Sequence, residues 1–418
     1  MNLLERANVG EIKKTERIHK ISIDANNNKN YPVYQIPLEY LYYNNQNGRI
    51  NTAYRKYLSN HDVLTPELGN SDYNDIFEDF IYKSSKKDMD NTIKSMRRRG
   101  QDVPGVVLPD GRVIDGNRRL TALRKIQKES NKTMYFEAVI LELDVNSKYD
   151  QKKIKGLELY LQHGMEGRVN YDPIDRIFDV YNTIVVEQLM TVEEYREAYG
   201  ERISKQSIDK SIGVANLIIR FVNMISPGGN AIDKFYLAKD LKLDGPLEEV
   251  YSVLKKIDED TKDEIIDSTL AYLLITKNNN NNDNEPTKAM RKLKKYILNN
   301  KEVSNRFVNI VDKHVDDIYD SFTSNPVENS NELKLRFTTD NNFIDSTNKI
   351  KKSTEEIIKK EEKNKERLKA IFSFYEAIEL LEDLSEEDFD YLDDKELIEL
   401  KGLASKLSDE LYRIKRII

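Results

Sequence analysis

Residues 106–124 read VVLPDGRVIDGNRRLTALR and contain two turn signals, two short apolar runs and two adjacent arginines. Pro-Asp-Gly separates the apolar runs at residues 106–108 and 112–114, which predicts a β-hairpin. A second turn, Asp-Gly-Asn, precedes a segment whose apolar residues recur at helical spacing from Leu120 onward. We therefore expect a strand, a turn and the first turn of a helix to meet around the two arginines.

This expected helix start carries a group of residues suited to holding a phosphate: Gly116, Asn117, Arg118 and Arg119. The first turn of a helix has unpaired backbone N–H groups and the positive end of the helix dipole, and both attract anions. An arginine can grip a phosphate through two parallel hydrogen bonds, whereas acidic residues usually occupy a first turn. Two arginines there indicate an anionic ligand; the alternative is that they are solvated or pair with local carboxylates.

The segment resembles the phosphate-binding box of the ParB/sulfiredoxin-like superfamily, in which a strand and a Gly-x-Arg-Arg turn precede an Arg- and Ala-rich helix. Here the box reads Gly-Asn-Arg-Arg at residues 116–119. A helix expected at residues 89–99 and a strand expected at residues 135–143 flank it in the order found in that family. The resemblance implies an α+β fold, with a small mixed-sheet ParB/sulfiredoxin-like domain followed by mostly α-helical domains that include a helix-turn-helix.

Two carboxylates are candidates for catalysis beside a nucleotide, namely Asp115 and Glu158. Mg²⁺ needs only one or two protein carboxylates in addition to phosphate oxygens. ParB-like proteins carry Glu-Asn-x-x-Arg where Glu158 stands, but here Leu159 takes the place of the Asn and Gln162 or His163 that of the Arg. Asp115 serves equally well as a turn or helix-cap residue. The four histidines show no ligand spacing, so no protein-held metal site is expected.

A helix-turn-helix is expected after the box domain. Residues 170–176 resemble the Asn-Pro-hydrophobic-Glu opening of the ParB central helical domain, and Asp172 can cap a helix that has Pro173 in its first turn. Thr191 and Glu194 then form a capping-box pattern, and Gly200 supplies a stop. Ser204 can cap the next helix, which is expected to run to about residue 221.

In that layout one group of residues would meet DNA: Arg202, Lys205, Gln206, Ser207 and Lys210. An ordinary helical hairpin is the alternative, because Glu201 and Asp209 dilute the positive charge. The chain has a net charge of -7, so binding to DNA requires a local basic patch.

Composition sets further limits. The 418 residues predict two or three domains, and the absence of cysteine excludes the thiol chemistry of sulfiredoxin itself. No apolar run approaches the ~20 residues of a membrane span, and the first residues lack the pattern of a signal peptide. We therefore expect a cytoplasmic protein that does not contact a membrane.

The expected division of the chain follows changes in composition. A phosphate- and nucleotide-binding domain, with an insertion at about residues 51–87, is followed by helical segments and an Asn-rich linker. A strand-like run at residues 333–338 lies near the last boundary, and the heptads beyond it are too few to predict a coiled coil. The segments are residues 1–165 (nucleotide-binding domain), 166–277 (helical domain with the helix-turn-helix), 278–286 (linker), 287–345 (helical extension and linker) and 346–418 (C-terminal helices, for oligomerisation or as a capping subdomain).

The resemblance implies a ParB-like, DNA-binding protein that acts as a homodimer. It would bind a nucleoside triphosphate with Mg²⁺, CTP being favoured, as a nucleotide-dependent switch in segregation or regulation. One alternative is an enzyme of the same fold, either an NTP hydrolase, a nuclease or a phosphotransferase, in which Asp115 or Glu158 organises Mg²⁺. The other is a non-catalytic adaptor that binds protein through its C-terminal helices. A fold does not choose among these functions.

Overall fold

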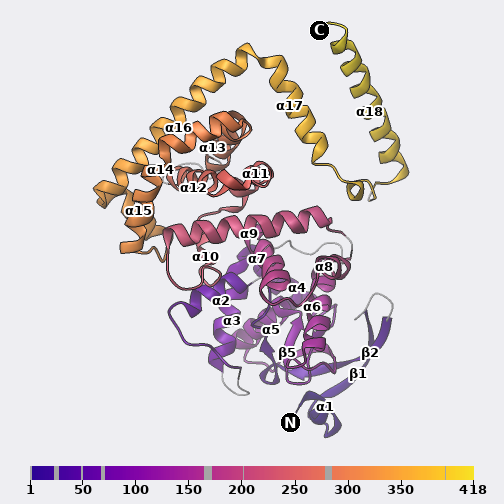
Figure 1. Cartoon of the computed structure of the whole chain (residues 1–418). Helices are drawn as coiled ribbons and strands as arrows, with labels where there is room; N and C mark the ends of the chain where they lie inside the picture. Colours follow the sequence, from indigo (N-terminus) through magenta and orange to yellow (C-terminus); the bar gives the residue numbers. More distant parts are fainter. Residues whose placement is uncertain are drawn as a thin grey trace.

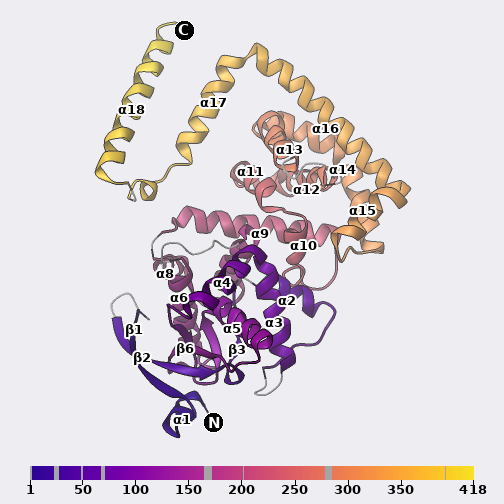
Figure 2. The same cartoon turned by 180° about the vertical axis from the view of Figure 1, so that it is seen from behind.

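The computed structural model describes residues 2–22, 28–48, 50–66, 71–163, 172–200, 202–277, 285–390 and 392–418. A sheet domain is followed by a body of packed helices and then by two outlying helices (Figure 1). Helix α9 (Lys205–Ile225) lies between the sheet domain and the later helices of residues 244–367 in both views (Figures 1 and 2). The predicted fold class, a small mixed sheet followed by mostly α-helical domains, is confirmed.

A six-stranded mixed sheet forms the first domain, in the order β1-β2-β6-β4-β5-β3. β4 and β5 pair antiparallel around the Pro-Asp-Gly turn, so the predicted hairpin is confirmed. β3 runs parallel to β5, and β4 runs parallel to β6. The strands are β1 (Lys13–Ser22), β2 (Asn28–Pro37), β3 (Tyr42–Tyr43), β4 (Gly105–Val107), β5 (Arg112–Asp115) and β6 (Tyr135–Ile140).

Helices cover both faces of this sheet because its strands carry apolar side chains on both. Ala138 and Ile140 of β6 belong to the core on one face, and the intervening Val139 belongs to the core on the other. The first face is covered by α3 (Ser71–Ser84), α4 (Lys86–Arg99) and α5 (Asn117–Ser130), and the second by α6 (Lys148–His163). A short helix, α1 (Leu3–Asn8), precedes the sheet.

The segment expected as an insertion, residues 51–87, forms α2 (Asn51–Leu58), α3 and the start of α4. Its aromatic side chains pack inside the domain: the Tyr73 and Phe77 rings are stacked with centroids 4.4 Å apart, and both are buried. Aromatic burial of this size stabilises a small domain strongly. The insertion is therefore an integral layer of the sheet domain.

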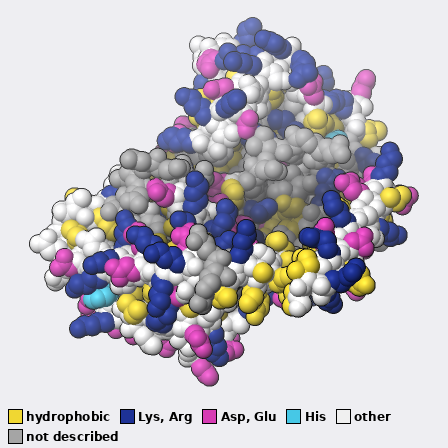
Figure 3. Space-filling view, turned by 90° about the horizontal axis from the view of Figure 1, so that it is seen from above, with side chains coloured by type: hydrophobic (Ala, Val, Ile, Leu, Met, Phe, Trp, Pro, Cys, Tyr) yellow, Lys and Arg dark blue, Asp and Glu magenta, His cyan; other side chains and the backbone are white. Residues whose placement is uncertain are grey.

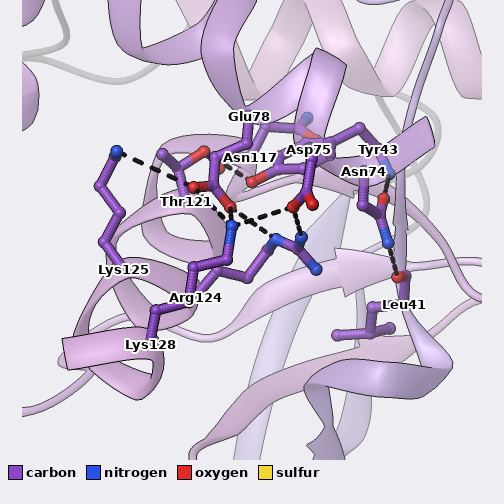
Figure 4. A network of polar contacts seen from close by, with 10 residues as sticks. All are labelled: Leu41, Tyr43, Asn74, Asp75, Glu78, Asn117, Thr121, Arg124, Lys125 and Lys128. Atoms are coloured by element: carbon purple, nitrogen blue, oxygen red, sulfur yellow. Dashed lines mark hydrogen bonds and ion pairs between the residues drawn. The ribbon is translucent and has the colours of Figure 1, made fainter. Parts of the chain in front are cut away.

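A buried ionic network joins the insertion to α5 (Figure 4). Arg124 of α5 binds Glu78 and Asp75 of α3, each at 2.7 Å, and Lys128 binds Asp75 at 2.9 Å. Glu78 is only 5% exposed, so its charge depends on these partners. The cations in the second half of α5 thus hold α3 in place, and the ligand prediction rests on the first turn of α5 alone.

The helical body has one continuous core that reaches from α7 to α16 and contains the buried rings of Phe221, Phe307 and Phe343. The helices α7 and α8 begin as predicted, with an Asp172 cap and with the Thr191–Glu194 capping box. Besides α9, the body consists of α7 (Pro173–Tyr181), α8 (Val192–Ala198), α10 (Tyr236–Asp240), α11 (Asp244–Leu254), α12 (Glu259–Thr276), α13 (Glu285–Leu293), α14 (Lys301–Ser324), α15 (Ser330–Thr339), α16 (Asn341–Arg367) and two π-helical segments (Asn182–Val186 and Lys294–Leu298).

Three expectations about this region need correction. Residues 278–284 of the expected linker lie outside the described residues, but α13 already begins at Glu285. The strand-like run at residues 333–338 is part of helix α15, which Asn329 caps. The expected division after residue 345 falls inside α16, because apolar residues spaced by seven, Phe343, Ile350 and Ile357, bury one face of that helix in the common core.

The last two helices, α17 (Lys369–Glu382) and α18 (Asp394–Lys415), stand away from the body in both views (Figures 1 and 2). Glu376 and Glu379 of α17 bind Lys295 and Lys294 of the body at 3.0 and 3.1 Å. α18 has no buried residue. Among the described residues, every helix is too short or too polar to span a bilayer.

Helix α2 of the sheet domain docks on α7 and α10 of the helical body. Thr52 of α2 donates to the buried Asp175 carboxylate at 2.5 Å, and Lys239 of α10 binds the other oxygen of that carboxylate. Beside this contact, Lys56 of α2 binds Asp240 at 2.5 Å. Burial raises the pKa of Asp175 to about 6, and the Lys239 and Thr52 contacts offset only part of that effect. The junction therefore carries a carboxylate that is costly to ionise.

Asp175→Asn should make the junction less sensitive to pH. The pKa of Asp175 rises from 3.8 to about 6 on folding, so its favourable contribution is present below about pH 4 and is lost as pH rises through 6. The variant should gain stability relative to the wild type between pH 4 and 7.5, by up to roughly 2–3 kcal/mol. Urea unfolding at several pH values measures this difference. Asp233→Asn, which removes a 62% exposed carboxylate from the same junction, is the control; an equal pH response in both variants would contradict the prediction.

Candidate nucleotide and phosphate site

The first turn of α5 is open. Gly116 precedes the helix with a φ of +99°, a left-handed conformation that glycine adopts without strain. A Cβ atom at Gly116 would also lie 2.8 Å from the Phe136 ring, so the position requires glycine. No side chain caps this helix start. The backbone N–H groups of the first turn are thus available to an anion, as the sequence predicts.

Arg119 is less available than the sequence suggests. Its Nη2 atom binds Asp115 Oδ2 at 2.7 Å, and its guanidinium lies over Gly116. Only 20% of the Arg119 side chain and 11% of the Asp115 side chain are exposed. The Arg119 Nε atom is buried and has no hydrogen-bond partner among the described residues. Asp115 therefore orients Arg119 across the turn and leaves one edge of the guanidinium unused.

Asn117 supplies a second unused polar group. The residue is 6% exposed, and its Oδ1 atom is buried without a hydrogen-bond partner in the described part of the chain. Its backbone carbonyl accepts from Thr121, whose hydroxyl also contacts Tyr43 at 2.8 Å. A buried acceptor left unmatched is rare in proteins because it costs about 1–3 kcal/mol. Asn117 is thus positioned to accept a hydrogen bond from a ligand or water. Arg118, the third residue of the box, is partly buried.

Sequence reasoning missed one group near the box, His19 of β1. Burial lowers the pKa of His19, and the Arg119 and Arg17 guanidinium groups lower it further while Asp115 acts in the opposite direction. The imidazole therefore lies within electrostatic reach of the Asp115–Arg119 pair. No motif marks this position, because the strand that carries it is dense in charged residues.

Glu158 lies in a different part of the site, a pocket of about 520 Å³ between the sheet domain and the helical body. Its carboxylate accepts from the Gly48 N–H at 3.3 Å and lies 3.8 Å from Lys155. Burial acts to lower the pKa of Lys155, but the Asp179 and Glu158 carboxylates outweigh it, so the pKa is raised and the amine stays charged. Asp179 also accepts from Tyr195 at 3.0 Å. The pocket thus holds a buried cation flanked by two carboxylates.

Both domains contribute to the pocket. Asn45, Asn51 and Arg55 come from the sheet domain, and Phe178 and Asn182 come from the helical body. Many of the lining side chains are amides, which offer both a donor and an acceptor. The amides are those of Asn44, Asn45, Gln46, Asn51, Gln151 and Asn182.

The loop at residues 44–48 connects the pocket to the box. β3 and β5 are parallel neighbours, so the loop that follows β3 starts at the same end of the sheet as α5. Asn45 lines the pocket and accepts from Arg112 of β5 at 3.2 Å. Gly116 to Arg119 are absent from the pocket lining formed by the described residues. The pocket-lining loop and the first turn of α5 therefore start at the same end of the sheet.

The structure does not gather the two candidate catalytic carboxylates around a metal position. Arg119 binds Asp115, while Gly48 and Lys155 hold Glu158. Across the described ranges there is no group of three or more His, Cys, Asp or Glu residues that could hold a metal ion. A nucleotide-bound Mg²⁺ would need only one of these carboxylates.

The predicted DNA-contacting residues lie at the exposed start of α9, which Ser204 caps as predicted. Lys205 binds Glu193 at 3.1 Å, and Lys210 lies 3.3 Å from Glu248. Arg202 and Gln206 are exposed, and Ser207 accepts from the Ser211 hydroxyl through its carbonyl.

The rest of α9 is largely buried in the body, so it is a central packing helix more than a surface helix, and it ends at Ile225 instead of near residue 221. Figure 3 shows basic and acidic side chains interspersed over the face that it views.

Comparison with solved structures gives a similarity in fold. The chain resembles a solved structure described as the C2221 form of a Pnob8-like ParB-N domain, with 14% sequence identity and a TM-score of 0.29 over 56% of this chain and 89% of that chain. No protein-family model matches the chain, and no curated protein matches it. With so low a TM-score the two structures superpose only loosely, and the function has to be inferred from the site itself.

Proposed function

We propose that this chain is a ParB-like, DNA-associated protein that binds a nucleoside triphosphate with Mg²⁺ and so controls the docking of its helical body on its sheet domain. Two observations carry the proposal: the interdomain pocket and the uncapped first turn of α5, which starts at the same end of the sheet as the pocket-lining loop 44–48. A ligand that fills both parts contacts both domains at once.

The phosphates fit the first turn of α5. Free N–H groups and the helix dipole favour an anion there, and Arg118 adds a cation. The unmatched Arg119 Nε and Asn117 Oδ1 atoms can bond to a phosphate oxygen and to a ligand hydroxyl or water, respectively. Asp115 or Glu158 would face a Mg²⁺ ion carried by the phosphates. That ion would neutralise phosphate charge.

The nucleoside fits the pocket. Its volume of about 520 Å³ is in the range of small-molecule sites, and its amide side chains match the alternating donors and acceptors of a base edge. The resemblance to ParB-like proteins favours CTP among the triphosphates. The amide lining by itself does not choose a base.

The pocket is coupled to the domain junction through Arg55. This residue lines the pocket, binds Asp233 of the helical body and lies 4.8 Å from the Phe178 ring centre. Its Nη2 atom also donates to Asn182 at 3.4 Å. Occupancy of the pocket would therefore change contacts that hold the two domains together. By linkage, any partner that favours one arrangement of the domains would change nucleotide affinity.

An enzymatic function is the second candidate. Both carboxylates are already engaged as acceptors, Asp115 by Arg119 and Glu158 by Gly48 and Lys155. Carboxylates that are engaged in this way are better suited to orienting a ligand or a neighbouring side chain than to transferring a proton. We therefore propose nucleotide binding as the first function, and hydrolysis, nuclease activity or phosphotransfer as the second.

Calorimetric titration with CTP, ATP and GTP in the presence of Mg²⁺, with and without duplex DNA, tests the proposal. One triphosphate should bind, and Arg118→Ala should weaken it by about 10-fold or more, because charge-assisted hydrogen bonds contribute roughly 1.5–3 kcal/mol. Arg98→Ala, which removes an exposed arginine from α4, is the matched control and should leave the affinity unchanged. Binding of none of the three nucleotides, or equal affinity in the two variants, would contradict the proposal.

We also propose that the protein is a homodimer joined through α18. Apolar residues recur along this helix at alternating spacings of three and four. The stretch is too short to predict a coiled coil from the sequence alone, but it forms one apolar stripe along the helix. None of them is buried. In a parallel pair Glu410 of one copy would lie beside Lys415 of the other, at the flanking positions that form interhelical ion pairs. The core positions are Leu397, Leu400, Ala404, Leu407, Leu411 and Ile414.

Light scattering after gel filtration measures the mass of the wild type and of α18 variants. The wild type should be a dimer, and Leu407→Ser with Leu411→Ser should convert it to a monomer, since both substitutions remove apolar area from the seam. Tyr412→Ser removes a side chain that is 67% exposed and lies off the seam, and it should leave the dimer intact. A monomeric wild type, or a double variant that stays dimeric, would show that α18 is not the interface.

A further inference from the structure

The β1–β2 hairpin is a two-stranded ribbon whose outer half extends beyond the rest of the sheet. β2 pairs with β6 only between Val33 and Pro37, whereas β1 continues to pair with β2 as far as Ser22 and Asn28. The ribbon projects from the edge of the sheet domain in both views (Figures 1 and 2). β1 is the first strand of the sheet, so its outer edge has no neighbouring strand in the described sheet.

This ribbon is held to the domain both at Arg17 and near its far end, at Ile21. Ile21 is buried in the core that α6 shares, and Tyr31 packs against the same core. The Arg17 guanidinium donates to the Asp102 carbonyl at 2.6 Å and binds Glu137 of β6. One face of the ribbon is thus fixed to the domain. Because the ribbon is held in this way, the residues on its other face keep fixed positions.

The ribbon is basic in a chain that is acidic as a whole, with a net charge of -7. β1 and β2 together carry four lysines and Arg17 against one carboxylate, Glu16. The four lysines are exposed, and no ion pair involves them within the described part of the chain. They are Lys13, Lys14, Lys20 and Lys29. The contrast with α9 is direct, because Lys205 and Lys210 both lie beside glutamates.

An exposed apolar side chain lies among these charges. Ile18 is 69% exposed and shares the face of Lys20, because side chains two residues apart in a strand point the same way. That face is opposite to the one on which Ile21 is buried. An isoleucine beside lysines fits a partner surface that carries both negative charge and apolar groups. A DNA groove is such a surface, because it combines phosphates with sugars and base methyl groups.

We propose that the β1–β2 ribbon binds duplex DNA through the face of Ile18, with Lys14 and Lys20 of that face on the phosphates and Ile18 against the groove. Two paired strands are about 5 Å apart, and with side chains they fit a major groove roughly 12 Å wide. The counter-charge of the phosphates explains why four exposed lysines gather without carboxylate partners. The inference rests on the proposed association with DNA and assigns it to the ribbon in place of α9.

Fluorescence anisotropy of a labelled 30-base-pair duplex, titrated with full-length protein at several salt concentrations, tests this assignment. Lys14→Ala combined with Lys20→Ala should lower affinity about 10-fold near 0.1 M salt and should reduce the salt slope by about 2, or about 0.9 for each lost phosphate contact. The matched control is Lys205→Ala with Lys210→Ala on α9, which should change both quantities less. Ile18→Ser should lower affinity without changing the slope.

Each outcome separates the possibilities. If the wild type binds the duplex and the ribbon variant binds it with the same affinity, the assignment to the ribbon is wrong but the association with DNA remains. No duplex binding by the wild type, or tighter binding to vesicles rich in phosphatidylserine than to the duplex, would overturn both the assignment and the proposed association with DNA. The ribbon variant should bind nucleotide with the affinity of the wild type. The calorimetric titration therefore tests nucleotide binding independently of the assignment of DNA to the ribbon.

Discussion

A left-handed glycine between β5 and α5 sets the geometry on which the candidate site depends. Gly116 turns the chain in a conformation with φ of +99°, and the Phe136 ring leaves no room for a side chain there. The Asp115–Arg119 ion pair closes over the same turn. With the turn held in this way, α5 starts at the end of β5 with its first N–H groups uncapped, and the box, loop 44–48 and α6 are brought to one end of the sheet.

The junction between the two domains is unusually polar for a buried contact. Asp175, Asp179, Glu158 and Lys155 are all largely buried, and each has an oppositely charged partner. Removing charges from water is expensive, so such contacts stabilise a protein less than an apolar interface of the same area. A junction of this kind can be rearranged by a charged ligand at modest cost in free energy. This property agrees with a pocket that both domains line and that a nucleotide would bridge.

Local signals predicted much of the fold. The Pro-Asp-Gly hairpin, the start of α5, the Asp172 and Ser204 caps and the Thr191–Glu194 capping box depend on neighbouring residues, and all are present. The strand β1, KKTERIHKIS, was missed because charged residues on both faces hide its alternation. α15 was misread as strand because its apolar residues are few and only Leu333 is buried.

The site could be predicted only in part. Glycine and arginine spacing pointed to the first turn of α5, but the Asp115–Arg119 pair and the neutralised lysines of α9 depend on side-chain geometry that spacing does not show. The interdomain pocket combines residues from 44 to 189, so no local pattern could reveal it.

Hydrogen exchange measured by mass spectrometry, with Mg²⁺ alone and with Mg²⁺ plus CTP, ATP or GTP, tests the central claim most directly. If one nucleotide bridges the two domains, exchange should slow together at the first turn of α5, in loop 44–48 and along the pocket-lining parts of α6 and α7. Protection confined to one domain, or no change at these segments with any of the three nucleotides, would contradict the account.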